Sequence, residues 1–169
     1  MSIMLEMELH GVNLDVLTQQ PVVILRDPGA KRFLPIWIGQ SEATSILMEM
    51  QGIKPGRPLT HDLLKTFIEN LKASVKQIVI DDLKDGTFFA KIYVNANSRD
   101  LTIDARPSDA IALAVRMKAP IFAEEGVLDE ASILTEEGED DEIQRFRSFL
   151  DSIDPEDFGP GGSSGGPQG

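Results

Sequence analysis

The sequence TIDARPSDAIALAVR, at residues 102–116, decides the fold of this chain. Its second half, residues 110–115, contains no polar side chain. A helix that is apolar on every side is buried, because it has no face that water would solvate. Before it, Leu101 and Ile103 alternate with polar neighbours, which is the period of a half-buried strand. We therefore predict a strand that leads directly into a buried central helix.

The boundary between this strand and this helix is rich in polar residues. Pro107 is compatible with a first helical turn, Ser108 is expected to cap it, and Asp109 complements the positive end of the helix dipole. Asp104 and Arg106 allow two interpretations. They form an ion pair that locks the strand to the helix, or the aspartates bind a divalent cation while Arg106 binds phosphate. The sequence leaves both open.

The other elements are predicted from hydrophobic periodicity and turn residues. Strands are expected at 5–9, 21–26, 32–38, 75–80, 87–94, 101–104 and 120–123, and helices at 43–50, 60–71, 110–115 and 127–131. The Asp85-Gly86 pair is the strongest hairpin signal. Strands and helices that are grouped rather than strictly alternating are typical of an α+β protein. The predicted fold is a single curved, mostly antiparallel sheet with helices packed against it.

The chain is expected to form one domain, residues 1–135, followed by two shorter segments. From residue 136 onward there are ten acidic and two basic residues. Apolar residues at helical spacing within this acidic segment predict an amphipathic C-terminal helical extension at 136–158. Residues 159–169, which read GPGGSSGGPQG, have nothing to bury and are expected to be a disordered tail.

Charge and composition restrict the classes of function. The net charge is −12, and no basic stripe is present, which disfavours tight nonspecific binding to DNA. This charge remains compatible with a metal-dependent nuclease, because such an enzyme needs carboxylates and its metal supplies positive charge.

The composition also bears on location. The chain has no cysteine, no apolar run of the roughly 18 residues that cross a bilayer, and no basic signal region. We expect a cytoplasmic protein without membrane contacts.

A second group of polar residues precedes the predicted helix at 60–71. Arg57 and a His61–Asp62 pair lie near the start of this helix, where a phosphate can bind or a water can be activated. The alternative is ordinary capping, with Thr60 at the cap and the pair solvated in the first turn. Glu42 starts the preceding helix and is either a metal ligand or an acid that favours the helix dipole.

The strand at 32–38 predicts self-association. Pro35 cannot donate a ladder hydrogen bond, so this strand is an edge strand or is bulged there. Its apolar side chains exceed what one buried face needs, and uncovered edges invite pairing. A homo-oligomer is therefore expected, most simply a twofold dimer. Trp37 is interpreted as a core or interface residue in preference to a base-stacking platform.

Four blocks in a fixed order carry a resemblance to a known family. They are RFLPIWIGQSEA (32–43), RPLTHDLL (57–64), DLKDGTFFAKI (82–92) and ARPSDAIALAVR (105–116). From about Met4 to Leu134 the chain resembles the bifunctional nuclease domain family. The resemblance implies an α+β domain that hydrolyses DNA and RNA, and therefore a nucleic-acid partner.

The leading hypothesis is a nuclease with weak, metal-assisted hydrolysis, and its residue roles come from side-chain chemistry. Carboxylates would hold a divalent cation such as Mg²⁺, arginines would bind phosphate, and a histidine would act as base. The catalytic candidates are Asp104, Asp109, His61 and Asp62; the phosphate-binding candidates are Arg57 and Arg106; the metal-ligand candidates are Glu42, Asp62, Asp104 and Asp109. The alternative is a non-catalytic oligomeric interaction or regulatory module. Whether the carboxylates converge in an open cleft distinguishes the two.

Overall fold

The structure is a computed structural model, and it describes residues 3–29 and 31–134. These residues belong to one compact unit, Met1–Leu134. The acidic helical extension expected at 136–158 and the tail at 159–169 lie outside the described residues, so both stay predictions. Within the described part, no helix is long and apolar enough to cross a membrane.

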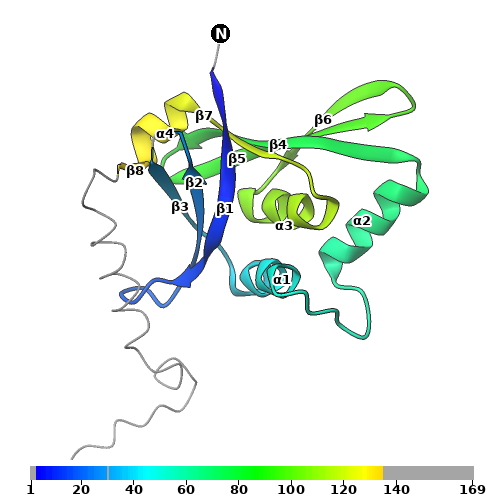
Figure 1. Ribbon diagram of the computed structural model, residues 1–169, viewed down its shortest axis with the longest axis horizontal. Coiled ribbons are helices and arrows are strands. Elements are labelled where there is room, and N and C mark those ends of the chain that lie inside the picture. The colour runs from blue at the N-terminus through cyan, green and yellow to red at the C-terminus, as the bar shows by residue number, and fades with distance from the viewer. Residues whose placement is uncertain (1–2, 30, 135–169) are drawn as a thin grey trace, which may run out of the picture. The chain divides into compact units, whose positions relative to one another are not determined.

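The described residues form one eight-stranded sheet in the order β6-β5-β4-β7-β1-β2-β3-β8 (Figure 1). The strands are β1 (Met4–Leu14), β2 (Pro21–Asp27), β3 (Arg32–Trp37), β4 (Ala73–Lys84), β5 (Thr87–Ala96), β6 (Arg99–Ala105), β7 (Ile121–Glu124) and β8 (Ile133–Leu134). Within this sheet only the β4–β7 pair is parallel, and the other neighbours are antiparallel. The predicted α+β class with a mostly antiparallel sheet is confirmed.

Helices pack against this sheet and enclose the core (Figure 1). They are α1 (Gln40–Met50), α2 (Thr60–Asn70), α3 (Pro107–Met117) and α4 (Glu125–Ala131). The central helix α3 lies between α1 and α2, and its residues 110–114 are almost fully buried. The prediction of a buried helix after the strand at 101–104 is therefore confirmed, because α3 has helices or sheet on most sides.

The hairpin between β4 and β5 forms where Asp85 and Gly86 predicted it. Both residues have positive φ angles, 52° and 76°. Two-residue hairpin turns of type I′ require positive φ at both central positions, which Asp and Gly tolerate better than most residues. This hairpin fixes the register of β5, and β5 in turn pairs with β6, the strand that leads into α3.

Two predicted helix caps are wrong. At α2 the cap position is Leu59 rather than Thr60, and Asp62 accepts the Leu59 backbone N–H at 2.8 Å. At α3 the cap position is Arg106 and Pro107 occupies the first turn, so Ser108 is already helical. In both cases the helix starts one or two residues before the predicted cap, and at α2 a first-turn carboxylate, Asp62, supplies the cap contact.

The strand at 32–38 is only partly an edge strand. Its first residues, Arg32 and Phe33, pair with β8, which covers that end. Leu34 and Ile36 point into the core, and Pro35, which lacks a donor, lies beyond the β8 pairing. Trp37 remains 48% exposed. The expected dimer therefore stays a prediction, and among the described residues less of the β3 edge is unpaired than the sequence suggested.

Candidate functional site

A cleft of about 730 Å³ opens where the first turns of α1, α2 and α3 approach strand β6. Its walls include acidic, basic and imidazole side chains from all four elements: Glu42, His61, Asp104, Arg106 and Asp109. The N-terminal turn of a helix presents unpaired backbone N–H groups and the positive end of its dipole. Three such turns around one cleft favour the binding of an anionic group.

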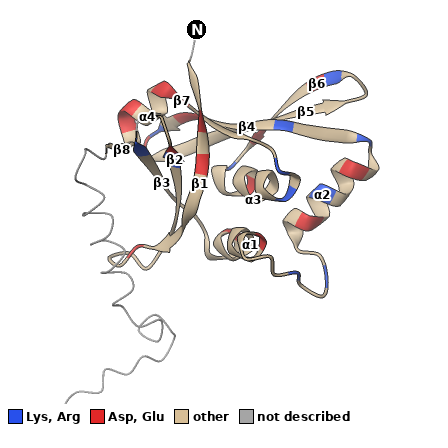
Figure 2. Cartoon of the chain, viewed as in Figure 1, with Lys and Arg blue, Asp and Glu red and all other residues tan. Residues whose placement is uncertain are grey.

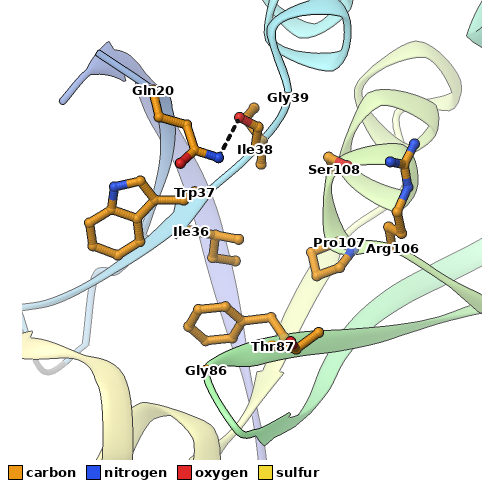
Figure 3. A pocket seen from close by; sticks show the side chains of 11 residues that line it. Gln20, Ile36, Trp37, Ile38, Gly39, Gly86, Thr87, Arg106, Pro107 and Ser108 are labelled. Atoms are coloured by element: carbon orange, nitrogen blue, oxygen red, sulfur yellow. Dashed lines mark hydrogen bonds between the residues drawn. The ribbon is translucent and has the colours of Figure 1, made fainter. Parts of the chain in front are cut away.

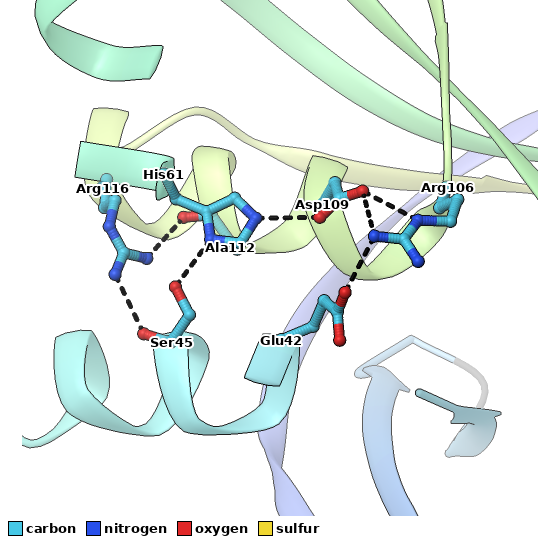
Figure 4. Close-up of polar contacts among 7 residues, drawn as sticks. All are labelled: Glu42, Ser45, His61, Arg106, Asp109, Ala112 and Arg116. Atoms are coloured by element: carbon cyan, nitrogen blue, oxygen red, sulfur yellow. Dashed lines mark hydrogen bonds and ion pairs between the residues drawn. The ribbon is translucent and has the colours of Figure 1, made fainter. Parts of the chain in front are cut away.

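Arg106 joins two carboxylates at the mouth of this cleft (Figure 4). Its Nη2 lies 2.8 Å from Glu42 Oε1 and 2.8 Å from Asp109 Oδ2, and its Nε donates to Asp109 Oδ2 at 2.9 Å. Glu42 and Asp109 are therefore neighbours, although they belong to different helices. The Arg106 side chain is 67% exposed, whereas its two partners are largely shielded. An exposed cation thus covers a partly buried pair of carboxylates.

His61 connects Asp109 to helix α1 (Figure 4). Its Nε2 lies 2.9 Å from Asp109 Oδ1, and its Nδ1 lies 2.7 Å from the hydroxyl of Ser45. An ionised carboxylate only accepts hydrogen bonds, so Nε2 carries the proton. In the neutral ring, Nδ1 then accepts the Ser45 O–H. The His61 side chain is only 7% exposed, and both ring nitrogens are engaged, so it holds Asp109 in place.

The electrostatics of the cluster favour its charged state. Burial opposes ionisation of Asp109, but the hydrogen bonds from His61 and Arg106 outweigh it and hold the pKa of this carboxyl below its usual value. The same contacts raise the pKa of Arg106, chiefly through its hydrogen bond to Asp109 and then through Glu42. At neutral pH the cluster therefore contains the Arg106 cation beside the ionised carboxylate of Asp109.

A second ion pair lies behind the cluster and is structural. Arg116, whose side chain is 3% exposed, donates from Nε to Asp62 Oδ1 at 2.7 Å. Its Nη1 and Nη2 donate to the backbone carbonyls of Ala112 and Ser45, each at 3.0 Å. Arg116 thereby ties α3 to both α1 and α2. Burial disfavours the charged form of Asp62, but Arg116 and the Leu59 N–H lower its pKa overall.

The structure separates the predicted site residues into two groups. Glu42, His61, Arg106 and Asp109 come together in one hydrogen-bonded cluster. The other three predicted residues do not join it. Asp62 pairs with Arg116, Asp104 pairs across β5 and β6 with Lys91 at 3.0 Å, and Arg57 is exposed in the loop before α2 and does not line the cleft.

One interpretation of Asp104 is corrected by these contacts. The sequence allowed an ion pair between Asp104 and a buried Arg106, but Arg106 is exposed and its carboxylate partners are Glu42 and Asp109. Asp104 is 72% exposed at the rim of the cleft. In the register of β5 and β6, Asp104 lies directly opposite Lys91, so its carboxylate pairs with that ammonium on the neighbouring strand instead.

Sequence reasoning missed Ser45 and Arg116. Ser45 lies in the middle of a helix, where a serine carries no local signal. Arg116 did carry one, because it is the first charged residue after Asp109 and directly follows the helix predicted to be buried at 110–115. A buried arginine requires a carboxylate or several carbonyl partners, and it has both here.

The carboxylate pair has a limited capacity for metal. Among residues 3–29 and 31–134, no three or more Asp, Glu or His side chains are grouped so that they could hold a metal ion. Glu42 and Asp109 alone supply two neighbouring carboxylates. Mg²⁺ commonly binds one or two carboxylates and completes its shell with water and substrate phosphate. These residues therefore fit Mg²⁺ in the presence of a phosphate substrate, and do not form an all-protein metal cage.

Gly39 sets the position of Glu42. It occupies the cap position of α1, and a Cβ built on it would collide with the Glu42 carboxylate. The carboxylate can fold back over the helix start only because residue 39 has no side chain. That position brings it to Arg106 and, through Arg106, to Asp109.

Comparison with known proteins places the chain in a family. The bifunctional nuclease domain matches residues 23–136, and the chain belongs to the bifunctional nuclease domain family. An uncharacterized protein of Mycobacterium tuberculosis is 43% identical over 162 residues, which cover 90% of this chain and 97% of that protein.

More distant relatives carry the family's activity in their names. Bifunctional nuclease 2 of rice, Oryza sativa subsp. japonica, is 29% identical over 116 residues, which cover 66% of this chain and 36% of the rice protein. Bifunctional nuclease 2 of Arabidopsis thaliana is 27% identical over 116 residues, which cover 66% of this chain and 35% of that protein. The match therefore spans about a third of these plant proteins.

Proposed function

We propose that this protein hydrolyses phosphodiester bonds of DNA and RNA with the help of a divalent cation such as Mg²⁺. One observation carries the proposal: two carboxylates, Glu42 and Asp109, share one exposed arginine at the mouth of an open cleft. Carboxylates that are held together beside a phosphate-binding cation are what metal-assisted phosphodiester cleavage requires. Membership of the family and the names of the plant relatives support the same reaction.

In this proposal the residues have separate roles. Glu42 and Asp109 would hold the cation, which neutralises charge on the phosphate and lowers the pKa of a bound water. Arg106 binds a phosphate oxygen, because Nε and one Nη make its contacts to the carboxylates and the exposed side chain has further N–H donors. His61 is a positioning residue that orients Asp109. Its two engaged nitrogens argue against the role of general base that the sequence suggested.

The remaining candidates take supporting roles. Asp62 stabilises the fold through Arg116, and Asp104 lies at the cleft rim, where its charge is matched by Lys91.

Weak hydrolysis is consistent with the charge of the chain. Acidic and basic residues alternate along α2, which carries Lys65 between Asp62 and Glu69 (Figure 2). Such a surface offers little nonspecific attraction for a polyanion.

We also infer a cytoplasmic location and a dimer. The absence of cysteine suits a reducing compartment. The part of β3 that no other described strand pairs with on its β8 side, and the edge strand β6, offer sites for pairing between two copies.

A second function is favoured by the same ion pairs. Arg106 already neutralises Glu42 and Asp109, and a cluster that satisfies its own charges needs no ligand. Under this alternative the protein is a non-catalytic interaction or regulatory module, and the cluster only fastens α3 to α1 and α2.

A hydrolysis assay separates the two functions. The purified protein is incubated with fluorescently labelled single-stranded DNA and RNA, with Mg²⁺ or with an excess of EDTA. Nuclease function predicts cleavage of both substrates that EDTA abolishes and that Asp109→Asn lowers by at least 100-fold. Asp100→Asn is the matched control, because Asp100 is an exposed aspartate of β6 that pairs with Lys76, away from the cleft lining. Cleavage that is absent, or equal in wild type and Asp109→Asn, would favour the interaction module.

A further inference from the structure

The two arginines at the ends of helix α3 are held in opposite ways. Arg116, in the last turn, has a side chain that is 3% exposed, and each of its three nitrogens donates to a different acceptor in the interior. Arg106, at the cap position, has a side chain that is 67% exposed, and it contacts the carboxylates of Glu42 and Asp109. Moving Arg116 would leave buried groups unpaired, whereas water can replace the contacts of an exposed arginine at low cost. Arg106 is therefore the arginine of the pair that is free to change its partners.

Arg106 also has room to move. Besides the acidic cleft, it borders a second cavity of about 370 Å³, which Trp37 lines on the far side. The guanidinium is turned away from this cavity, with Pro107 and Ser108 between it and the indole (Figure 3). Its present contacts thus lie entirely on the side of the two carboxylates. Because open space adjoins Arg106 on both sides, the side chain can adopt another rotamer without displacing the packed core.

Arg106 occupies the carboxylate oxygens that a cation would need. Asp109 Oδ1 accepts the N–H of His61, and Asp109 Oδ2 is contacted by both Nε and Nη2 of Arg106, at 2.9 and 2.8 Å. A carboxylate oxygen has two lone pairs, so Oδ2 is fully used. The same Nη2 lies 2.8 Å from Glu42 Oε1. The guanidinium therefore bridges the two carboxylates at the position from which a small cation would contact both.

We propose that Arg106 is an exchangeable counterion, which holds Glu42 and Asp109 together and leaves them when a divalent cation binds. Two neighbouring carboxylates without a counterion repel each other, and one of them tends to take up a proton. Arg106 prevents this, and after its release its N–H donors are available to a substrate phosphate. The inference rests on the proposed nuclease function and adds this exchange to it. The self-neutralised cluster and the cation-binding site are then two states of the same residues.

The release of Arg106 is measured directly by NMR of the arginine side chains. The protein carries ¹⁵N-labelled arginine, and the Nε–H signal of Arg106 is assigned by its loss in Arg106→Met. We expect this signal to shift, and its proton to exchange faster with water, as MgCl₂ is added. The Arg116 signal is the internal control and should not change, because its Nε also donates to a carboxylate but is buried. NaCl at the same ionic strength accounts for screening, which weakens exposed ion pairs by itself.

Metal affinity gives a second, independent measurement. Mn²⁺ is titrated as a paramagnetic substitute for Mg²⁺, and the free ion is quantified by electron paramagnetic resonance. Arg106→Met removes the competing cation and should bind Mn²⁺ about tenfold more tightly than wild type. Lys76→Met is the matched control, because it also removes one positive charge from an ion pair with an exposed carboxylate, Asp100, away from the cleft lining. Its affinity for Mn²⁺ should equal that of wild type. Circular dichroism confirms that each variant is folded.

The outcomes separate this inference from the nuclease proposal. If MgCl₂ moves the Arg106 signal no more than NaCl does, or if Arg106→Met binds Mn²⁺ no better than wild type, the exchange is overturned even when EDTA-sensitive hydrolysis occurs. If the signal responds and Arg106→Met binds more tightly, but the wild type cleaves neither DNA nor RNA, the exchange stands and the nuclease function fails. Equal tightening in Lys76→Met also contradicts the proposal, because net charge alone would then explain the gain in affinity.

Discussion

His61 and Asp109 lie 48 positions apart in the sequence and are joined by a hydrogen bond of 2.9 Å between Nε2 and Oδ1. This bond orients the carboxylate that also contacts Arg106. The other ring nitrogen of His61 bonds to Ser45 and so ties the start of α2 to α1. The position of Asp109 is therefore fixed by contacts from α1 and α2 as well as by its own helix, α3.

Substitution of His61 distinguishes a positioning residue from a general base. His61→Gln keeps an amide N–H that can reach Asp109, whereas His61→Leu removes both hydrogen bonds. We expect His61→Gln to retain a measurable part of the hydrolysis rate, and His61→Leu to lose it and to destabilise the protein by about 1–3 kcal/mol. Hydrolysis rates and urea unfolding measure the two effects. Equal loss of activity in both variants, with the fold intact, would restore the base role.

Two aspartates that were predicted as metal ligands are expected to differ in their effect on stability. Asp62→Asn weakens the partner of Arg116, which is buried, and should cost about 2–3 kcal/mol in the free energy of unfolding. Asp104→Asn breaks an exposed pair with Lys91 and should leave the melting temperature unchanged. Thermal unfolding of both variants tests this. A large destabilisation by Asp104→Asn would mean that the contacts of β6 are wrongly assigned.

Gly39→Ala tests the position of Glu42 without changing a charge. The added Cβ collides with Glu42 Oε2, so the carboxylate must shift and its contact with Arg106 is expected to weaken. The backbone of residue 39 is extended, with φ −75°, and accepts alanine, so we expect a loss of stability of only about 1 kcal/mol from the poorer cap. Hydrolysis should fall at least tenfold. Gly56→Ala is the control, since no atom approaches a Cβ at that position. Unchanged activity of Gly39→Ala would exclude Glu42 from the site.

The stability of the protein should depend on pH through Asp109 and Asp62. Both carboxyls have a folded-state pKa below the ordinary value of 3.8. A lowered pKa contributes stability that is fully present above the unfolded value and is lost as the pH falls through the folded value. We expect the free energy of unfolding to be steady near pH 6 and to decline below about pH 4. Urea unfolding of Asp109→Asn should show a smaller decline. An equal decline in wild type and in Asp109→Asn would mean that Asp109 does not contribute to the pH dependence of stability.

The fold was predictable wherever local patterns agree with the packing. The apolar run at 110–115 predicted a buried helix and the Asp85-Gly86 pair predicted a hairpin, and both are present. The helix caps were not predictable to the residue. Leu59 and Arg106 occupy the cap positions because the chain reaches them in an extended conformation, which side-chain propensity does not reveal.

The members of the cluster were identified from the sequence as candidates, but their pairing was not. Glu42, His61, Arg106 and Asp109 were each identified as candidates because polar residues gather at helix starts. Which cation meets which carboxylate depends on how α1, α2 and α3 pack. The neighbour in sequence, Asp104, therefore proved a poorer partner for Arg106 than Glu42, which is 64 positions away.

The most direct test of the central claim is the Mg²⁺ dependence of hydrolysis in wild type and in Glu42→Gln. The rate of cleavage of a labelled single-stranded RNA is measured over a range of Mg²⁺ concentrations, with EDTA as the zero point. If Glu42 and Asp109 hold the cation, Glu42→Gln should need at least tenfold more Mg²⁺ and should reach a lower maximal rate, with an unchanged melting temperature. Hydrolysis that is absent in wild type, or a Mg²⁺ dependence that is identical in both proteins, would contradict the account.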